Sequence, residues 1–251
     1  MARMYGKKSS YLWRSDKLYL VAAFCCSIIL LVIWYLVFIE YFKYWFSFSG
    51  IVALLISFGP LALIAYLLYK SYDRKSNNFY RGRKGEGAIW YELIKLSDEY
   101  CLFQDVKIGE RGNIDFIVLG PTGLFAIEVK SHAGYVSFKD GELTLNNRPA
   151  DKDFLKQAMA EALNTHNYLQ YSLNEDIFVN PVIVFSNRRA RMHFMLEPVR
   201  NVFVVQKRFL RRLLLSKPIS KPTIFTPDKV SIIEGELKKL IVDNNNQSLV
   251  K

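Results

Sequence analysis

Residues 113–131 read NIDFIVLGPTGLFAIEVKS, and this stretch decides the fold of the 251-residue chain. Two runs rich in β-branched and aromatic residues flank Gly120-Pro121-Thr122-Gly123, which predicts a β-hairpin closed by a tight turn. The charged residues within it are Asp115, Glu128 and Lys130. Charged side chains are costly to desolvate in strands that pack into a core. Their presence here therefore indicates a site.

The register of the hairpin brings these charges together. If Gly120 pairs with Gly123, the antiparallel register sets Asp115 opposite Glu128, with the two Cβ atoms roughly 5 Å apart. Lys130 shares the face of Glu128, because side chains alternate along a strand. We therefore expect two carboxylates and one ammonium at one place.

Two interpretations of this cluster remain open from the residues alone. The two carboxylates repel each other by about 3 kcal/mol at an effective dielectric near 20, and a divalent cation bound through oxygen, Mg²⁺ or Mn²⁺, would remove that repulsion. Alternatively, Lys130 neutralises one carboxylate in a purely structural triad. We favour the metal site, because buried ion pairs are often no more stable than apolar replacements.

The flanking sequence predicts an α/β domain with a mixed sheet. Before the hairpin, Ile89, Leu93, Leu96 and Tyr100 recur at helical spacing, and Glu86 extends this stripe backwards. On that spacing alone Glu86 is an ordinary acidic residue of a first helical turn. Further strands are expected at 101–106, 134–139, 142–146, 177–186 and 201–205, and helices at 153–171, 206–216 and from Thr226-Pro227 onwards.

The segments GRKGEG (82–87), NIDFIVLGPTGLFAIEVKSHAG (113–134) and KQAMAEALN (156–164) together resemble the nuclease-related domain, NERD, of the PD-(D/E)XK nuclease superfamily. The resemblance covers residues 82–186. It implies an α/β, mixed-sheet nuclease-like domain in which Asp115 and Glu128 bind the metal and Lys130 is the catalytic lysine. Glu86 and Gln157 are implied as auxiliary site residues.

The implied activity is metal-dependent hydrolysis of phosphodiester bonds in cytoplasmic DNA or RNA, with Mg²⁺ or Mn²⁺ as cofactor. The backbone carbonyl of Val129 is a further candidate ligand, and Lys130 would orient the nucleophile or stabilise charge on the phosphate. Gln157 either holds water or phosphate or is an ordinary surface amide. The alternative function is a non-catalytic nucleic-acid-binding or assembly module tethered to the membrane.

The N-terminal third predicts a membrane anchor. A basic tail (1–17) precedes uncharged runs at 18–39 and 46–69, each long enough as a helix to cross the roughly 30 Å hydrocarbon layer. We expect residues 18–69 to form a transmembrane hairpin and 70–84 a basic linker that breaks the helix. Basic residues flank both ends, whereas the connecting loop has only Lys43. The positive-inside rule then places the protein in the inner cell membrane with both termini cytoplasmic.

The C-terminal extension, residues 187–251, is basic, in a chain of net charge +11. Such a surface suits nucleic acid or anionic lipid head groups of a bilayer, and charge alone does not choose between them. Three cysteines without a CxxC pair argue against a disulfide framework or structural zinc. The candidate nucleic-acid-binding residues are Arg188, Arg189, Arg191, Lys207, Arg208, Arg211 and Arg212.

Overall fold

The computed structural model describes residues 1–6, 25, 28–29, 32–37, 39, 48–109, 113–150, 152–194, 196–216 and 224–249. The chain divides into two compact units: Met1–Lys8 together with Arg81–Lys251, called the sheet unit below, and Ser9–Tyr80. The sheet unit contains all of the candidate site residues.

Helix α2 (Phe48–Leu93) runs without interruption and includes Pro60. The predicted helix break at 70–84 is therefore wrong, because Lys, Arg, Asn and Ser are tolerated on an exposed helix surface and each glycine costs only about 1 kcal/mol. The first predicted span, 18–39, lies mostly outside the described residues. Within the described part of the chain, no helix combines the length and the apolar composition needed to cross a membrane.

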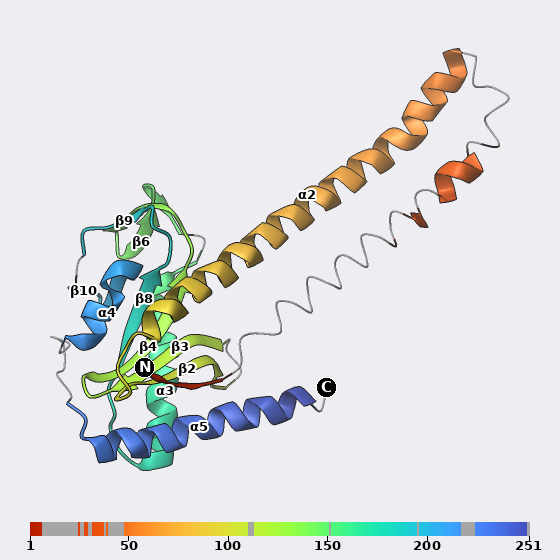
Figure 1. Ribbon diagram of the computed structural model, residues 1–251. Helices are drawn as coiled ribbons and strands as arrows, with labels where there is room; N and C mark the ends of the chain where they lie inside the picture. The colour runs from red at the N-terminus through yellow and green to blue at the C-terminus, as the bar shows by residue number, and fades with distance from the viewer. Residues whose placement is uncertain are drawn as a thin grey trace. The chain divides into compact units, whose positions relative to one another are not determined.

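A seven-stranded mixed sheet forms the centre of the sheet unit (Figure 1). In spatial order the strands are β1 (Arg3–Tyr5), β2 (Cys101–Lys107), β3 (Asn113–Gly120), β4 (Gly123–Lys130), β8 (Val179–Phe185), β11 (Val202–Gln206) and β10 (Pro198–Val199). Neighbouring pairs are parallel for β1–β2, β4–β8 and β8–β11 and antiparallel for β2–β3, β3–β4 and β11–β10.

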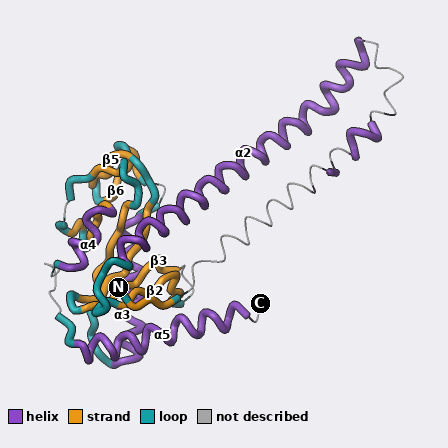
Figure 2. Tube along the Cα trace, in the orientation of Figure 1, coloured by secondary structure: helices purple, strands orange, loops and turns teal. Residues whose placement is uncertain are grey.

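Helices cover both faces of this sheet (Figure 2). The last turns of α2 and helix α4 (Lys207–Leu215) pack on one face through Ile89, Leu93 and Leu210. Helices α3 (Phe154–Leu173) and α5 (Pro227–Leu249) pack on the other, as in the cluster that joins Ala162 and Ile233. The predicted helix through Tyr100 ends earlier, at Leu93, although Leu96 and Tyr100 are still buried.

A second, four-stranded sheet extends from the end of β4. Its strands, in spatial order, are β7 (Arg148–Pro149), β6 (Glu142–Leu145), β5 (Gly134–Lys139) and β9 (Ala190–Arg191). Val136 and Leu143 pack with Phe154 and Leu155 at the start of α3. This contact holds the N-terminal turns of α3 close to the end of β4, where the charged residues lie.

The hairpin has the predicted register. The ladder between β3 and β4 runs from Gly120↔Gly123 to Phe116↔Ile127. A Cβ atom on Gly120 would lie 2.2 Å from the Tyr100 ring, so only glycine fits under this aromatic side chain. Local turn chemistry and a close tertiary contact therefore specify the same register.

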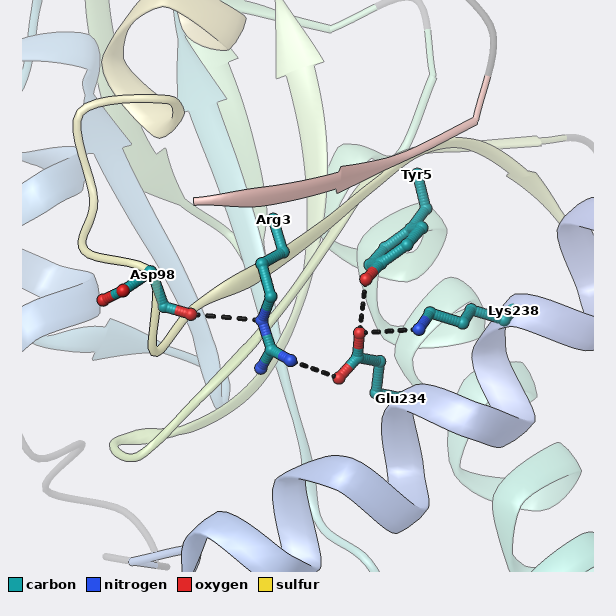
Figure 3. Close-up of polar contacts among 5 residues, drawn as sticks. All are labelled: Arg3, Tyr5, Asp98, Glu234 and Lys238. Atoms are coloured by element: carbon teal, nitrogen blue, oxygen red, sulfur yellow. Dashed lines mark hydrogen bonds and ion pairs between the residues drawn. The ribbon is translucent and has the colours of Figure 1, made fainter. Parts of the chain in front are cut away.

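The N-terminus belongs to the sheet unit, which the expectation of a simple basic tail missed. β1 pairs in parallel with β2, and its side chains reach α5 (Figure 3). Arg3 Nη1 lies 2.8 Å from Glu234 Oε2, and the Tyr5 hydroxyl donates to Glu234 Oε1 at 2.5 Å. Lys238 Nζ also contacts Oε1, at 2.9 Å. Although burial opposes ionisation, the Tyr5 and Lys238 hydrogen bonds and the Arg3 charge lower the pKa of Glu234.

Candidate functional site

Strands β3 and β4 separate at the position of the predicted carboxylate pair. Their ladder stops at Phe116↔Ile127, one step before Asp115 and Glu128. Beyond it, the Val129 backbone N–H donates to Asp115 Oδ2 at 2.7 Å, so a side chain replaces a backbone carbonyl as acceptor. The opening of the ladder leaves room for Asp115 beside β4.

The β2–β3 ladder brings a further carboxylate to this edge. It pairs Gln104 with Phe116 and Val106 with Ile114, so Asp105 lies opposite Asp115 in an unchanged register, although these two residues are not themselves paired and Asp105 has a φ of 56°. Such a φ is uncommon for a residue other than glycine and marks a local distortion of the strand. The Asp105 side chain accepts from Asn113 Nδ2 at 2.7 Å. Asp105 was not predicted as a site residue, because a local distortion of the backbone leaves no periodic signal in the sequence.

Glu128 and Lys130 form a nearly buried ion pair. Lys130 Nζ lies 2.6 Å from Glu128 Oε1, and the two side chains are 11% and 8% exposed. The same nitrogen donates to Gln157 Oε1 at 2.9 Å and lies 4.5 Å from the centre of the Phe154 ring. The ammonium is therefore held between β4 and α3. Of the two alternatives for Gln157, this contact supports a site residue.

Helix α3 contributes a carboxylate that sequence reasoning missed. Asp153 caps the helix by accepting from Lys156 N, which places Gln157 in the first turns facing β4. Gln157 Nε2 then donates to Glu161 Oε1 at 2.9 Å. Glu161 is only 8% exposed, and its Oε2 has no hydrogen-bond partner among the described residues. An acid four residues after Gln157, among the buried positions of an amphipathic helix, was the available signal.

Glu86 approaches the site from α2. A Cβ on Gly85 would lie 2.7 Å from Ser186 Oγ, so glycine allows the helix to pass close to the ends of β4 and β8. Burial raises the pKa of the half-buried Glu86, and the negative charges of Asp105 and Glu128 raise it further. Glu86 therefore belongs to the electrostatic environment of the hairpin carboxylates.

The site is acidic and short of positive charge. Burial, followed by the charges of Glu128 and Glu86, raises the pKa of Asp115 well above its usual value. Burial and the Glu128 charge raise the pKa of Glu161 to about 8. Lys130 is the cation bonded to Glu128. Such shifts are typical of carboxylates that share a site without enough counter-charge.

The donor set consists of carboxylate and carbonyl oxygens, which suits Mg²⁺ or Mn²⁺ better than zinc. In the described ranges, however, no three His, Cys, Asp or Glu side chains converge closely enough to enclose an ion. Water or substrate oxygens would therefore have to complete the ligand set of an ion held by Asp115, Glu128 and a backbone carbonyl.

The basic residues of the C-terminal extension fall into two groups. Arg208, Arg211 and Arg212 line a hollow of about 560 Å³ between α4 and Glu92 of α2. Arg188 and Arg189 lie in the turn after β8 and Arg191 in β9, and Lys207 begins α4. Gln206 lies directly before α4, and its Nε2 donates to the carbonyls of Arg188 and Ala190. These hydrogen bonds link the start of α4 to the turn after β8.

Comparison with known proteins gives one match. Residues 81–186 match the family model of the nuclease-related domain, NERD. The matched region contains Glu86, Asp115, Glu128 and Gln157, together with the unpredicted Glu161, whereas α4 and α5 lie beyond it. No curated protein and no solved structure matches the chain. The match indicates a nuclease-like function, with nucleic acid as the general class of substrate.

Proposed function

We propose that this chain is a metal-dependent nuclease that hydrolyses phosphodiester bonds in cytoplasmic DNA or RNA. The observation that carries the proposal is the excess of buried carboxylate over ammonium at the open end of the hairpin. The pKa of Asp115 is raised well above its usual value by burial and by Glu128. This environment stabilises a bound cation, and it lies inside the region that matches a nuclease-related domain.

Asp115, Glu128 and the backbone carbonyl of Val129 are the residues that would hold Mg²⁺ or Mn²⁺. When bound, the metal would polarise a phosphoryl oxygen and lower the pKa of a water molecule. Glu161 Oε2, which is buried and has no hydrogen-bond partner among the described residues, fits a place beside a cation or a water molecule.

Lys130 has a separate role in this proposal. Its ammonium is fixed by Glu128 and Gln157 at 2.6 and 2.9 Å, so it is oriented before substrate arrives. A preorganised donor stabilises charge that develops on a phosphate oxygen without having to reorganise during the reaction. Glu86, whose negative charge lies near Glu128, would hold water at the edge of the site.

The direct test is cleavage by the purified full chain of labelled DNA and RNA in Mg²⁺, Mn²⁺ or EDTA. We expect cleavage with metal, none in EDTA, and none by Asp115→Asn. Asp98→Asn, at an exposed carboxylate in a turn, is the matched control and should cleave like the parent. If nucleic acid binds but no cleavage occurs with either metal, the non-catalytic binding or assembly module replaces the enzyme.

We also propose that the basic residues Arg188, Arg189, Arg191, Lys207, Arg208, Arg211 and Arg212 bind the phosphate backbone. This proposal is supported by the hollow that Arg208, Arg211 and Arg212 line together with Glu92, where arginines outnumber the one acidic residue. Replacing these three arginines should weaken nucleic-acid binding about equally for all sequences and reduce its salt dependence. An unchanged salt dependence together with weaker binding to anionic vesicles would assign them to lipid instead.

Anchoring in the inner cell membrane is a further part of the proposal. It is supported by the uncharged runs 18–39 and 46–69 and by the basic residues that flank them. The pairing of β1 with β2 adds support, because residues 1–8 and 81–251 belong to one unit. Both ends of the intervening segment must then lie on the same side of the bilayer, as a two-helix hairpin with cytoplasmic termini requires.

A further inference from the structure

We propose that Glu161 is a positioning residue that fixes the orientation of the Gln157 amide and, through it, the direction of the Lys130 ammonium. The inference rests on the proposed function for its catalytic consequence. The arrangement it describes is a chain of hydrogen bonds from α3 to β4: Glu161 to Gln157, Gln157 to Lys130, and Lys130 to Glu128.

The first step concerns the two ends of the Gln157 side chain. An amide presents an acceptor oxygen at one end and a donor nitrogen at the other. Here Nε2 donates to Glu161 Oε1 and Oε1 accepts from Lys130 Nζ, both at 2.9 Å. An ammonium only donates, so the amide oxygen faces Lys130 and the NH₂ group faces Glu161. A single orientation of the amide therefore satisfies both neighbours, and Glu161 holds it by accepting from Nε2.

The second step concerns Lys130. An ammonium has three N–H bonds, and Glu128 and Gln157 use two of them. Nζ also lies 4.5 Å from the centre of the Phe154 ring, and in this proposal the remaining N–H, whose direction is set by the other two, turns to a phosphate oxygen. If the Gln157 amide flipped, its NH₂ group would face the ammonium, and Lys130 would have to turn away.

Glu161 does not contribute to the stability of the fold in an obvious way. The side chain is 8% exposed, and its Oε2 lacks a hydrogen-bond partner within the part of the chain that the structure describes. A buried carboxylate with one oxygen unsatisfied costs free energy. An apolar residue at this buried position of α3 would avoid that cost. What Glu161 provides, and an apolar residue would not, is the hydrogen bond to Gln157.

The test exchanges the two side chains. In Glu161→Gln, the new amide can present either its oxygen or its nitrogen to Gln157, so the orientation is no longer unique. In Gln157→Glu, two carboxylates meet without a donor between them. In the double exchange, Glu at 157 accepts from both Lys130 and the amide at 161, which restores an oxygen facing the ammonium. The single variants should therefore be impaired and the double variant rescued.

The kinetic expectation is specific. Each single variant should lose about tenfold or more in kcat with KM changed by less than about threefold, the usual size for residues that orient a catalytic group. The double exchange should recover most of that loss. Gln170→Glu is the control for Gln157→Glu. It adds one negative charge to an exposed position of the same helix, away from Gln157 and Glu161, and should keep the parental kcat. Additive losses in the double exchange, or a parental kcat in Glu161→Gln, would overturn the proposal.

A second readout separates this proposal from the nuclease itself. In the full chain, the Gln157 side-chain amide protons should exchange slowly with solvent, because they face a buried acceptor. Glu161→Leu, which keeps the apolar bulk and removes the acceptor, should speed this exchange about tenfold or more. If the parent cleaves nothing yet this change is seen, the proposed function fails and the orientation by Glu161 stands. If exchange is unchanged, Glu161 does not position Gln157, whatever the activity.

Discussion

The Asp115 carboxylate accepts a hydrogen bond from the backbone N–H of Val129, with 2.7 Å between Oδ2 and the nitrogen. A candidate metal ligand on β3 is thereby tied to the residue that follows the second candidate ligand, Glu128, on β4. Any change in the charge of Asp115 is therefore felt by the backbone between Glu128 and Lys130.

Asp115→Asn should stabilise the metal-free protein and abolish its stabilisation by metal. The amide oxygen can still accept from Val129, while the repulsion by Glu128 and Glu86 disappears. We expect a gain in the free energy of unfolding, because the repulsion that helps to raise the pKa of Asp115 is removed. Thermal unfolding of parent and variant, with Mg²⁺ and with EDTA, measures both effects. A variant less stable than the parent in EDTA would contradict the charge argument.

Lys130→Ala should behave in the opposite way. Removal of the ammonium leaves the Glu128 carboxylate nearly buried without its cation, which typically costs about 3 kcal/mol or more. Cleavage should fall about a hundredfold, the usual loss when one transition-state donor is removed. Calorimetry should show metal binding close to that of the parent. Loss of metal binding together with stability would instead indicate the structural triad of Asp115, Glu128 and Lys130.

The stability of the metal-free protein should decrease as pH rises from about 4.5 to about 8. Burial and the Glu128 charge raise the pKa of Glu161 from 4.5 to about 8, so the folded state retains a proton that the unfolded state loses across this window. The raised pKa of Asp115 acts in the same direction. Urea unfolding at several pH values across this range measures the free energy of unfolding, which should fall less steeply with pH in Glu161→Gln than in the parent. A parental slope in that variant would assign the pH dependence to other groups.

Gly85→Ala should destabilise the protein and reduce activity. The new methyl group would lie 2.7 Å from Ser186 Oγ and push α2, with Glu86, away from the ends of β4 and β8. Overpacking of this kind typically costs about 1–3 kcal/mol. Gly87→Ala is the matched control, because nothing lies within 4 Å of its added Cβ. It should be neutral or about 1 kcal/mol more stable, through helix propensity. If chemical denaturation gives the same change in unfolding free energy for Gly85→Ala and Gly87→Ala, the contact of Gly85 with Ser186 does not affect stability.

The topology predicts which positions a membrane-impermeant thiol reagent reaches. In a chain whose own cysteines are replaced, single cysteines at Ser9, Lys43 and Lys251 should react in intact cells only at position 43. The pairing of β1 with β2 requires Arg3–Tyr5 and Cys101–Lys107 to lie on the same side of the bilayer. Labelling at all three positions after permeabilisation is the control. Labelling at one terminus alone in intact cells would rule out the hairpin.

The sequence by itself determined the hairpin and the longer strands and helices of the sheet unit. The turn at Gly120–Gly123 and the apolar alternation around it act over a few residues, and a shift of one position would move every buried side chain to the other face. The register from Gly120↔Gly123 to Phe116↔Ile127 follows from these local rules. The helical spacing and caps of α3 and α5 were readable for the same reason.

Only the tertiary structure decided how distant segments complete the site. The end of the β3–β4 ladder at Phe116, the positive φ of Asp105 and the close approach at Gly85 each depend on the packing of segments that no periodic pattern connects. Glu161 reads in sequence as one more helical acid, and becomes distinctive only because α3 packs its second turn against β4. Hydrophobic spacing specifies which face of an element is buried. The particular charges that meet there depend on how the buried faces pack together.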